Sequence, residues 1–163
     1  MTSTPPPHTN PRSQWLRHWS VLPQGKLKAA ASELAQRYQV EDLGLAQSGL
    51  GLLPLADSAL GEAYFLGEIP LAQAHVRLRG DKGQTAEGAA LLLDDRTGVA
   101  HAMAILDAVL AARLPGHELA EALLHEGAAV VRDHERQRRA LLAATRVDFS
   151  LLGSADEEDD DDA

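Results

Sequence analysis

The stretch His75-Val76-Arg77-Leu78-Arg79-Gly80-Asp81-Lys82-Gly83 decides the fold class of this 163-residue chain. In its first five residues polar and apolar side chains alternate strictly, which is typical of a β-strand with one buried face. The next four residues contain two glycines and an aspartate, the composition of a tight hairpin turn. Two strands joined by such a short turn run antiparallel, so this stretch predicts an antiparallel β-sheet.

Strand-like patterns extend on both sides of that stretch, from Glu41 to Leu93. The connections between them are too short for helical crossovers, which excludes a parallel Rossmann sheet. The predicted strands are Leu43–Gln47, Gly51–Ala56, Glu62–Gly67, Ala72–Arg79 and Thr85–Leu93.

Helical periodicity appears before and after the strand-rich region. Glu118–Arg132 fits either a helix broken near Gly127 or a short extended piece. Asp94-Asp95-Arg96 is interpreted as the cap and first turn of a helix. The predicted helices are one that starts at Pro11 with Asn10 as cap and ends before Pro23 and Gly25, then Lys26–Tyr38, Val99–Leu114 and Asp133–Thr145.

The order of these elements predicts an α+β fold. Helices pack on an antiparallel β-sheet, and N-terminal and C-terminal helices flank it. We expect a single domain over residues 11–153, a disordered N-terminus over residues 1–10 and a disordered acidic tail over residues 154–163.

Charge and composition narrow the function classes. The net charge of −9 comes mostly from seven consecutive acids, Asp156–Asp162, and no basic stripe with interleaved aromatics predicts nucleic-acid binding. The sequence has no cysteine, which excludes disulfides, thiol chemistry and an iron–sulfur cluster held by this chain. No apolar stretch approaches the ~20 residues needed to span a bilayer, so we expect a cytoplasmic protein without a membrane segment.

Both tryptophans of the chain lie on the first predicted helix. Trp15 and Trp19 share one apolar face with Leu16 and Leu22. Such a face can pack into the chain's own core, or it can anchor the helix on another subunit. The sequence leaves both alternatives open, so Trp15 and Trp19 are candidate partner-interface residues.

The segment Thr145-Arg146-Val147-Asp148-Phe149 lies between the last predicted helix and the acidic tail. Phenylalanine is scarce, with only two in the chain, so Phe149 needs an apolar place to bury itself. That place is either this domain's core or the groove of a partner.

Few residues of the sequence have the spacing typical of a catalytic or metal-binding site. His117, Glu121 and His125 are spaced to share one helix face, which can place metal ligands together. The spacing differs from the His-Glu-x-x-His pattern, so we assign no catalytic, cofactor-binding or metal-binding residue. A small metal-dependent hydrolase using these three residues stays as an alternative, as does an adaptor whose acidic tail binds a basic protein.

Four stretches give the chain a resemblance to the PhnG family, the G subunit of bacterial carbon–phosphorus lyase. Their order and spacing agree over roughly residues 12–153, although Asp94-Asp95-Arg96 and the following residues depart from the family pattern. The four stretches are the tryptophan helix running into Ser20-Val21-Leu22, Gly61-Glu62-Ala63-Tyr64-Phe65-Leu66-Gly67-Glu68, Gln73-Ala74-His75-Val76-Arg77-Leu78 and Ala144-Thr145-Arg146-Val147-Asp148-Phe149.

The resemblance implies an accessory subunit of the carbon–phosphorus lyase complex. With the H, I and L subunits, it would support transfer of the ribose triphosphate moiety of ATP, used with magnesium, to an alkylphosphonate, with release of adenine. The implied partners are the H, I and J subunits, with I the most direct, and the associated K and L subunits. S-adenosylmethionine and an iron–sulfur cluster belong to the J subunit.

With the resemblance in view, Arg146, Val147, Asp148 and Phe149 are interpreted as a docking element. Val147 and Phe149 would supply apolar anchors, and Arg146 with Asp148 would supply a charge-paired register.

Overall fold

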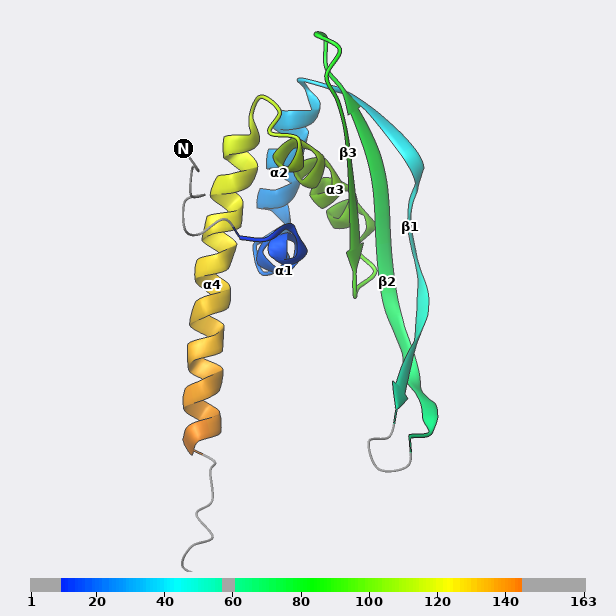
Figure 1. Cartoon of the computed structure of the whole chain (residues 1–163), viewed down its shortest axis with the longest axis vertical. Helices are drawn as coiled ribbons and strands as arrows, with labels where there is room; N and C mark the ends of the chain where they lie inside the picture. The colour runs from blue at the N-terminus through cyan, green and yellow to red at the C-terminus, as the bar shows by residue number, and fades with distance from the viewer. Residues whose placement is uncertain (1–9, 57–60, 145–163) are drawn as a thin grey trace, which may run out of the picture. The chain divides into compact units, whose positions relative to one another are not determined.

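The computed structural model describes residues 10–56 and 61–144 (Figure 1). The chain divides into two compact units, Met1–Val130 and Val131–Ala163, and the boundary falls inside the last helix. The elements in chain order are the 3₁₀ turn η1 (Arg12–Gln14), α1 (Trp15–Ser20), α2 (Gln24–Ala35), β1 (Gln39–Ala56), β2 (Ala63–Arg79), β3 (Thr85–Leu92), α3 (Thr97–Ala111) and α4 (His117–Ala144).

The three strands form one antiparallel sheet in the order β1-β2-β3, with helices before and after it in the chain. The predicted α+β fold class is therefore confirmed. Among the described helices, none is long and apolar enough to cross a membrane.

The predicted hairpin turn is also confirmed. The backbone N–H of Gly80 donates to the carbonyl of Gln84 at 2.8 Å, and the N–H of Gly83 donates to the carbonyl of Gly80 at 3.0 Å. Gly83 has a φ of 79°, a left-handed conformation that glycine adopts without strain. This turn sets the register in which Arg79 is paired with Thr85.

The prediction of five short strands was wrong. The four segments before the turn merge into two long strands, β1 and β2, which pair along nearly their whole length. Irregularities between Asp42 and Gln47 and between Leu53 and Pro54 absorb extra residues without ending the pairing. Pro70 is tolerated inside β2 because β3 pairs only from Ala72 onward, which leaves one edge of β2 free at that point.

Small residues build the core between the sheet and α3. Ala72, Ala74, Val76 and Leu78 alternate on the buried face of β2. At Gly88 of β3 an added Cβ would lie 2.2 Å from the carbonyl oxygen of Ala104 and 2.4 Å from the backbone nitrogen of Ala108. Alanine and glycine therefore let the α3 backbone approach the sheet closely, which explains how a chain with few aromatics fills its core.

The N-terminal helix is shorter than predicted and is capped differently. It consists of η1 and α1, and no side chain caps either element. Asn10 contributes its carbonyl oxygen, which accepts a hydrogen bond from Nε1 of Trp15 at 2.8 Å. Gly25, predicted as a terminator of the first helix, lies inside α2.

The start of α3 also corrects a prediction. Its N-cap residue is Arg96, without a side-chain cap bond. The Asp94 carboxylate accepts from the backbone N–H of Arg96 at 2.9 Å and from its guanidinium Nε at 2.9 Å, which holds the segment that precedes the helix. The Arg96 hydrogen bond lowers the pKa of Asp94, and burial opposes this shift only in part.

The last helix is longer than predicted. The ambiguous segment Glu118–Arg132 is helical and continuous with the predicted final helix, giving α4. Gly127 does not break it. A Cβ at Gly127 would lie 1.9 Å from the carbonyl oxygen of His18, so this glycine allows α4 to pack closely against α1.

Candidate docking surface

The two predicted tryptophans differ in exposure. Trp19 is fully buried, and its Nε1 donates to the carbonyl oxygen of Ala120 at 3.4 Å. Trp15 is half-buried, and its ring centroid lies 6.0 Å from that of Trp19. Core packing thus accounts for Trp19 in this chain, whereas Trp15 keeps part of its ring at the surface. The role of either residue at a partner interface stays a prediction.

The other predicted interface residues lie outside the described residues. They are Arg146, Val147, Asp148 and Phe149. Their role in docking stays a prediction.

The alternative metal site has no support in the described part of the chain. There, no group of three histidine, aspartate or glutamate side chains could hold a metal ion. His117 lies at the start of α4, where its Nδ1 is 3.1 Å from the carbonyl oxygen of Leu114. Glu121 and His125 lie further along the same helix beside Trp15 and Leu124, where the four help to line a small pocket.

One face of the sheet packs on α3, and the opposite face is exposed at every position of β3. Near the hairpin turn this open face is charged. Arg77 donates to the Glu87 carboxylate from two nitrogens, at 2.9 and 2.6 Å, and Arg79 donates to Glu41 at 2.7 Å. The Arg77 hydrogen bond lowers the pKa of Glu87. This half of the open face therefore carries ion-paired, charged side chains, which suit contact with water.

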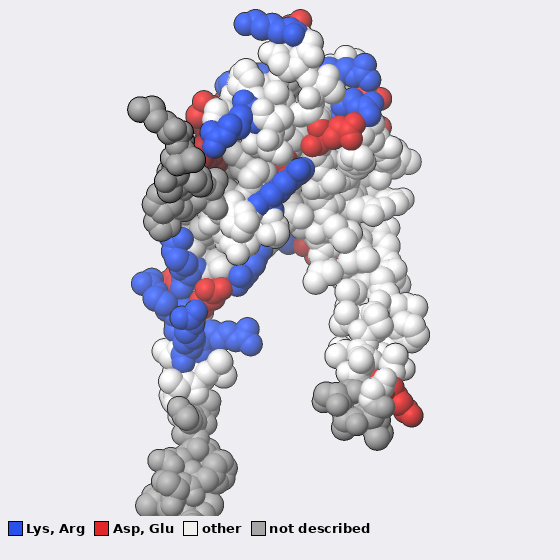
Figure 2. Space-filling model, in the orientation of Figure 1, with Lys and Arg blue, Asp and Glu red and all other residues white. Residues whose placement is uncertain are grey.

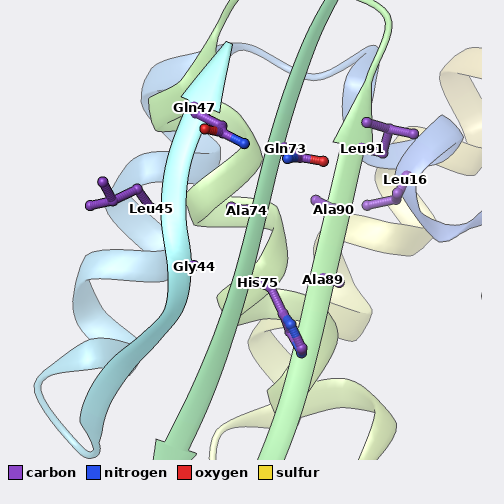
Figure 3. Close-up of a pocket in the computed structure, with 10 residues that line it drawn as sticks. All are labelled: Leu16, Gly44, Leu45, Gln47, Gln73, Ala74, His75, Ala89, Ala90 and Leu91. Carbon is purple, nitrogen blue, oxygen red and sulfur yellow. The ribbon is translucent and has the colours of Figure 1, made fainter. Parts of the chain in front are cut away.

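Further from the turn, the open face becomes a shallow hollow of about 610 Å³. Gly44 and Ala89 leave space over β1 and β3, and Gln47, Gln73 and His75 supply polar groups around it (Figure 3). Leu45, Leu91 and Leu16 complete the rim. The amide and imidazole groups could hydrogen-bond a partner's side chains, and the leucines could cover its apolar atoms.

Beyond the hollow, β1 and β2 continue as a two-stranded hairpin, here called the arm, formed by residues 48–56 and 63–71. β3 does not reach it, and none of its described residues is buried. Figure 2 shows this limb as almost free of charged atoms. Its exposed large apolar side chains are Leu50, Leu52, Leu53, Leu55, Tyr64, Phe65 and Leu66.

Both faces of the arm carry apolar side chains, and Glu68, opposite Leu52, is the one charged residue among positions 48–56 and 63–71. By strand register, Leu50 and Leu52 lie on the face that continues the buried face of β2, while Ile69 and Leu71 lie on the opposite face. Leu71 lies over Gly51, where an added Cβ would be 2.5 Å from its Cδ1. An isolated two-stranded hairpin is only marginally stable in water, and apolar patches of this extent are typical of interaction sites.

The two edges of the sheet are treated differently. At the β3 edge, the backbone N–H of Ala89 donates to the Asp107 carboxylate at 3.1 Å instead of to another strand. Arg12 binds the same carboxylate at 2.9 and 2.6 Å, which raises the pKa of Arg12. At the other edge, β1 carries no charged residue from Leu43 to Ala56. A long, uncharged edge strand is a template for pairing with another strand.

Sequence reasoning missed the arm and the open edge. The available signal was the leucine-rich, uncharged stretch from Gly49 to Leu55. Its glycines and proline instead suggested strand ends, because they usually punctuate short strands. The closeness of Arg12, Asp107 and Ala89 left no trace in the sequence pattern, since Asp107 lies 95 positions from Arg12 and 18 positions from Ala89.

The fold and the exposed surface define a class: a small α+β protein with an exposed apolar arm and an open sheet edge. The family model described as phosphonate metabolism protein PhnG matches residues 10–153, so the chain belongs to the PhnG family. That membership assigns it a role in phosphonate metabolism and implies association with other subunits of carbon–phosphorus lyase. The match covers nearly the same residues as the predicted domain. No curated protein matches the chain closely enough to count as a relative.

Proposed function

We propose that the chain is an accessory subunit of the carbon–phosphorus lyase complex in organic phosphonate catabolism. It supports, with the H, I and L subunits, transfer of the ribose triphosphate moiety of ATP to an alkylphosphonate with release of adenine. The product with methylphosphonate is α-D-ribose 1-methylphosphonate 5-triphosphate. The chain contributes binding surface rather than reacting groups. Family membership supports the pathway, and the arm supports the role as a docking subunit.

The arm is the observation that carries this proposal. Residues 48–56 and 63–71 expose apolar side chains on both faces and lack the third strand and helices that stabilise the rest of the sheet. Burying one exposed leucine on a partner is worth about 1.5–3 kcal/mol. A partner that covers both faces would therefore supply the stabilisation that this hairpin lacks in isolation.

The I subunit is the proposed occupant of this surface, with H and J in the same core and K and L associated. The complex would use ATP with magnesium, and the J subunit would hold the iron–sulfur cluster and S-adenosylmethionine. The absence of cysteine from this chain is consistent with that division of labour. The segment Arg146–Phe149 and the exposed part of Trp15 are proposed as further contacts, with Phe149→Ala weakening assembly.

Co-expression with the I subunit tests the docking role. A tagged chain should retain the I subunit through size-exclusion chromatography, and the double variant Leu50→Lys with Leu52→Lys should lose it, because two charges would be buried in an apolar interface. Leu93→Lys is the control, since Leu93 is also exposed, at 74%, but follows β3 and lies just outside the arm, next to the pairing of Leu92 with Ala72. Retention of the I subunit by the double variant would remove the arm from the interface.

Growth tests the pathway separately. A bacterial strain that lacks its own G subunit should grow on methylphosphonate as sole phosphorus source when it expresses this chain with its cognate H, I, J, K and L subunits. The arm double variant should fail to restore growth, whereas Leu93→Lys should succeed. No growth with the unaltered chain and its own partners would reject the assignment.

A further inference from the structure

The second half of α4 carries an exposed row of arginines. Arg132, Arg136 and Arg139 are spaced i, i+4 and i+7, so they lie along one side of the helix, here called the arginine face. All three are exposed, and Figure 2 shows Lys and Arg atoms gathered on this part of α4. Arg138 is exposed on an adjoining side of the same turn.

The charge of the arginine face is compensated only in part by its own helix, where Asp133 and Glu135 stand against the four arginines between positions 132 and 139. Arg136 pairs with Asp133 at 2.8 Å, and Asp133 also accepts from Gln137 at 2.9 Å. Among the described residues, neither Arg132 nor Arg139 forms an ion pair. Like-charged side chains one turn apart repel each other, so this face favours an anionic occupant.

The chain itself carries a segment of opposite charge close by. It continues for 19 residues after Ala144, and seven consecutive acids, Asp156–Asp162, lie near its end. Asp156 is the twelfth residue after Ala144, a span of up to about 40 Å when the chain is extended. Arg132 lies only about 18 Å back along the helix from Ala144. The acids can therefore reach every arginine of the face.

We propose that the acidic tail Asp156–Asp162 binds the arginine face of α4 in the same chain. Exposed single ion pairs are weak, but a tethered segment has an effective concentration on the order of millimolar, and several pairs can form together. The tail is thus the resident occupant of this surface. A partner with an acidic surface must displace it, so the tail limits which anions the arginine face binds.

A labelled peptide with the sequence of Ser154–Ala163 tests the proposal by fluorescence anisotropy in 20 mM salt. The chain truncated after Gly153 should bind the peptide at least about fivefold more tightly than the full chain, whose own tail competes from the same tether. The full chain with Asn or Gln in place of the seven tail acids should behave like the truncated chain. This second variant keeps the test decisive if truncation impairs folding.

Matched arginine variants locate the binding surface. In the truncated chain, Arg132→Gln, Arg136→Gln and Arg139→Gln together should weaken peptide binding at least about fivefold, and 500 mM salt should abolish it. A control with Lys28→Gln, Lys82→Gln and Arg113→Gln removes the same charge from outside α4 and should bind as before.

Three results would overturn the proposal. The first is equal peptide binding by the full and truncated chains. The second is equal loss of binding in the arginine variant and its control. The third is that the weaker peptide binding of the full chain, relative to the truncated chain, disappears when the protein is diluted. That result would identify the tail of a second copy as the occupant.

Discussion

The two ends of the β1–β2 strand pair differ in burial and in the number of neighbouring strands. At one end, β2 pairs with both neighbours and buries alternate residues from Ala72 to Leu78 against helices. At the other end, in the arm, β2 has one neighbour and buries none of its residues. Strand pairing alone therefore does not make a core. The helices bury one end of the sheet and leave the apolar side chains of the other end exposed.

The two edges of the sheet also differ. The β3 edge is closed by Arg12 and Asp107, and Asp107 also satisfies a backbone N–H of the strand. The β1 edge is open over its uncharged length. A protein that closes one edge and leaves the other apolar has one edge available for assembly.

The largest difference between the helix-covered end of the sheet and the arm is expected when a methyl group is added at a glycine in each. Gly88→Ala should lower the free energy of unfolding by about 3 kcal/mol, because its Cβ would collide with the backbone of α3 at Ala104. Gly49→Ala in the arm has no atom within 4 Å of the added Cβ and should be nearly neutral. Urea unfolding of both variants measures the difference. Equal losses would contradict the contrast in packing.

A smaller effect is expected at the closed edge. Asp107→Ala should cost about 2 kcal/mol, because it leaves the Ala89 N–H without its acceptor and removes the charged partner of Arg12. Asp95→Ala, an exposed aspartate nearby in sequence, is the control and should stay within about 0.5 kcal/mol of the parent. Thermal unfolding monitored by circular dichroism checks both. An unchanged free energy of unfolding in Asp107→Ala would mean that the hydrogen bond to Ala89 and the ion pair with Arg12 do not stabilise the fold.

A third, weaker effect depends on pH. Asp94→Asn should cost less than about 1 kcal/mol at pH 7, since the pair with Arg96 is partly exposed and solvent screens it. Because the folded-state pKa of Asp94 is lowered, its contribution is complete above the ordinary value of 3.8 and is lost as the pH falls through the lowered pKa.

Urea titrations between pH 7 and pH 2 should therefore show the parent and Asp94→Asn converging only at the acidic end. Asp95→Asn supplies the control at the neighbouring position. A gap between parent and variant that widens on acidification would have the wrong sign for this ion pair.

The smallest effect on the free chain is expected in the arm. Leu50→Lys combined with Leu52→Lys should change the free energy of unfolding by less than about 0.5 kcal/mol, because both leucines are already more than half exposed, at 68% and 58%. The same variant is expected to disrupt assembly. A large loss of stability in the isolated chain would show that the arm belongs to its own core, against the comparison drawn above.

Several features followed from local sequence. The alternation through Val76 and Leu78 placed the buried face of β2, and Gly80–Gly83 placed the turn, because both depend on residues close together in the chain. The family motifs indicated the class of protein, which the match over residues 10–153 confirms. Helix limits were less accurate. Gly25 was expected to end a helix, and a break near Gly127 was one of two alternatives, whereas both glycines lie inside helices.

By itself, the sequence determined the α+β class, the antiparallel hairpin and membership of the PhnG family, because these depend on periodicity, turn chemistry and short motifs. Only the tertiary structure decided that β1 and β2 run on past their helices as an exposed arm, and that Asp107 and Arg12 close the opposite edge. The physical reason is that exposure and edge pairing depend on which distant segments pack together. A leucine such as Leu78 is buried where helices cover the sheet, whereas Leu50 in the arm stays exposed.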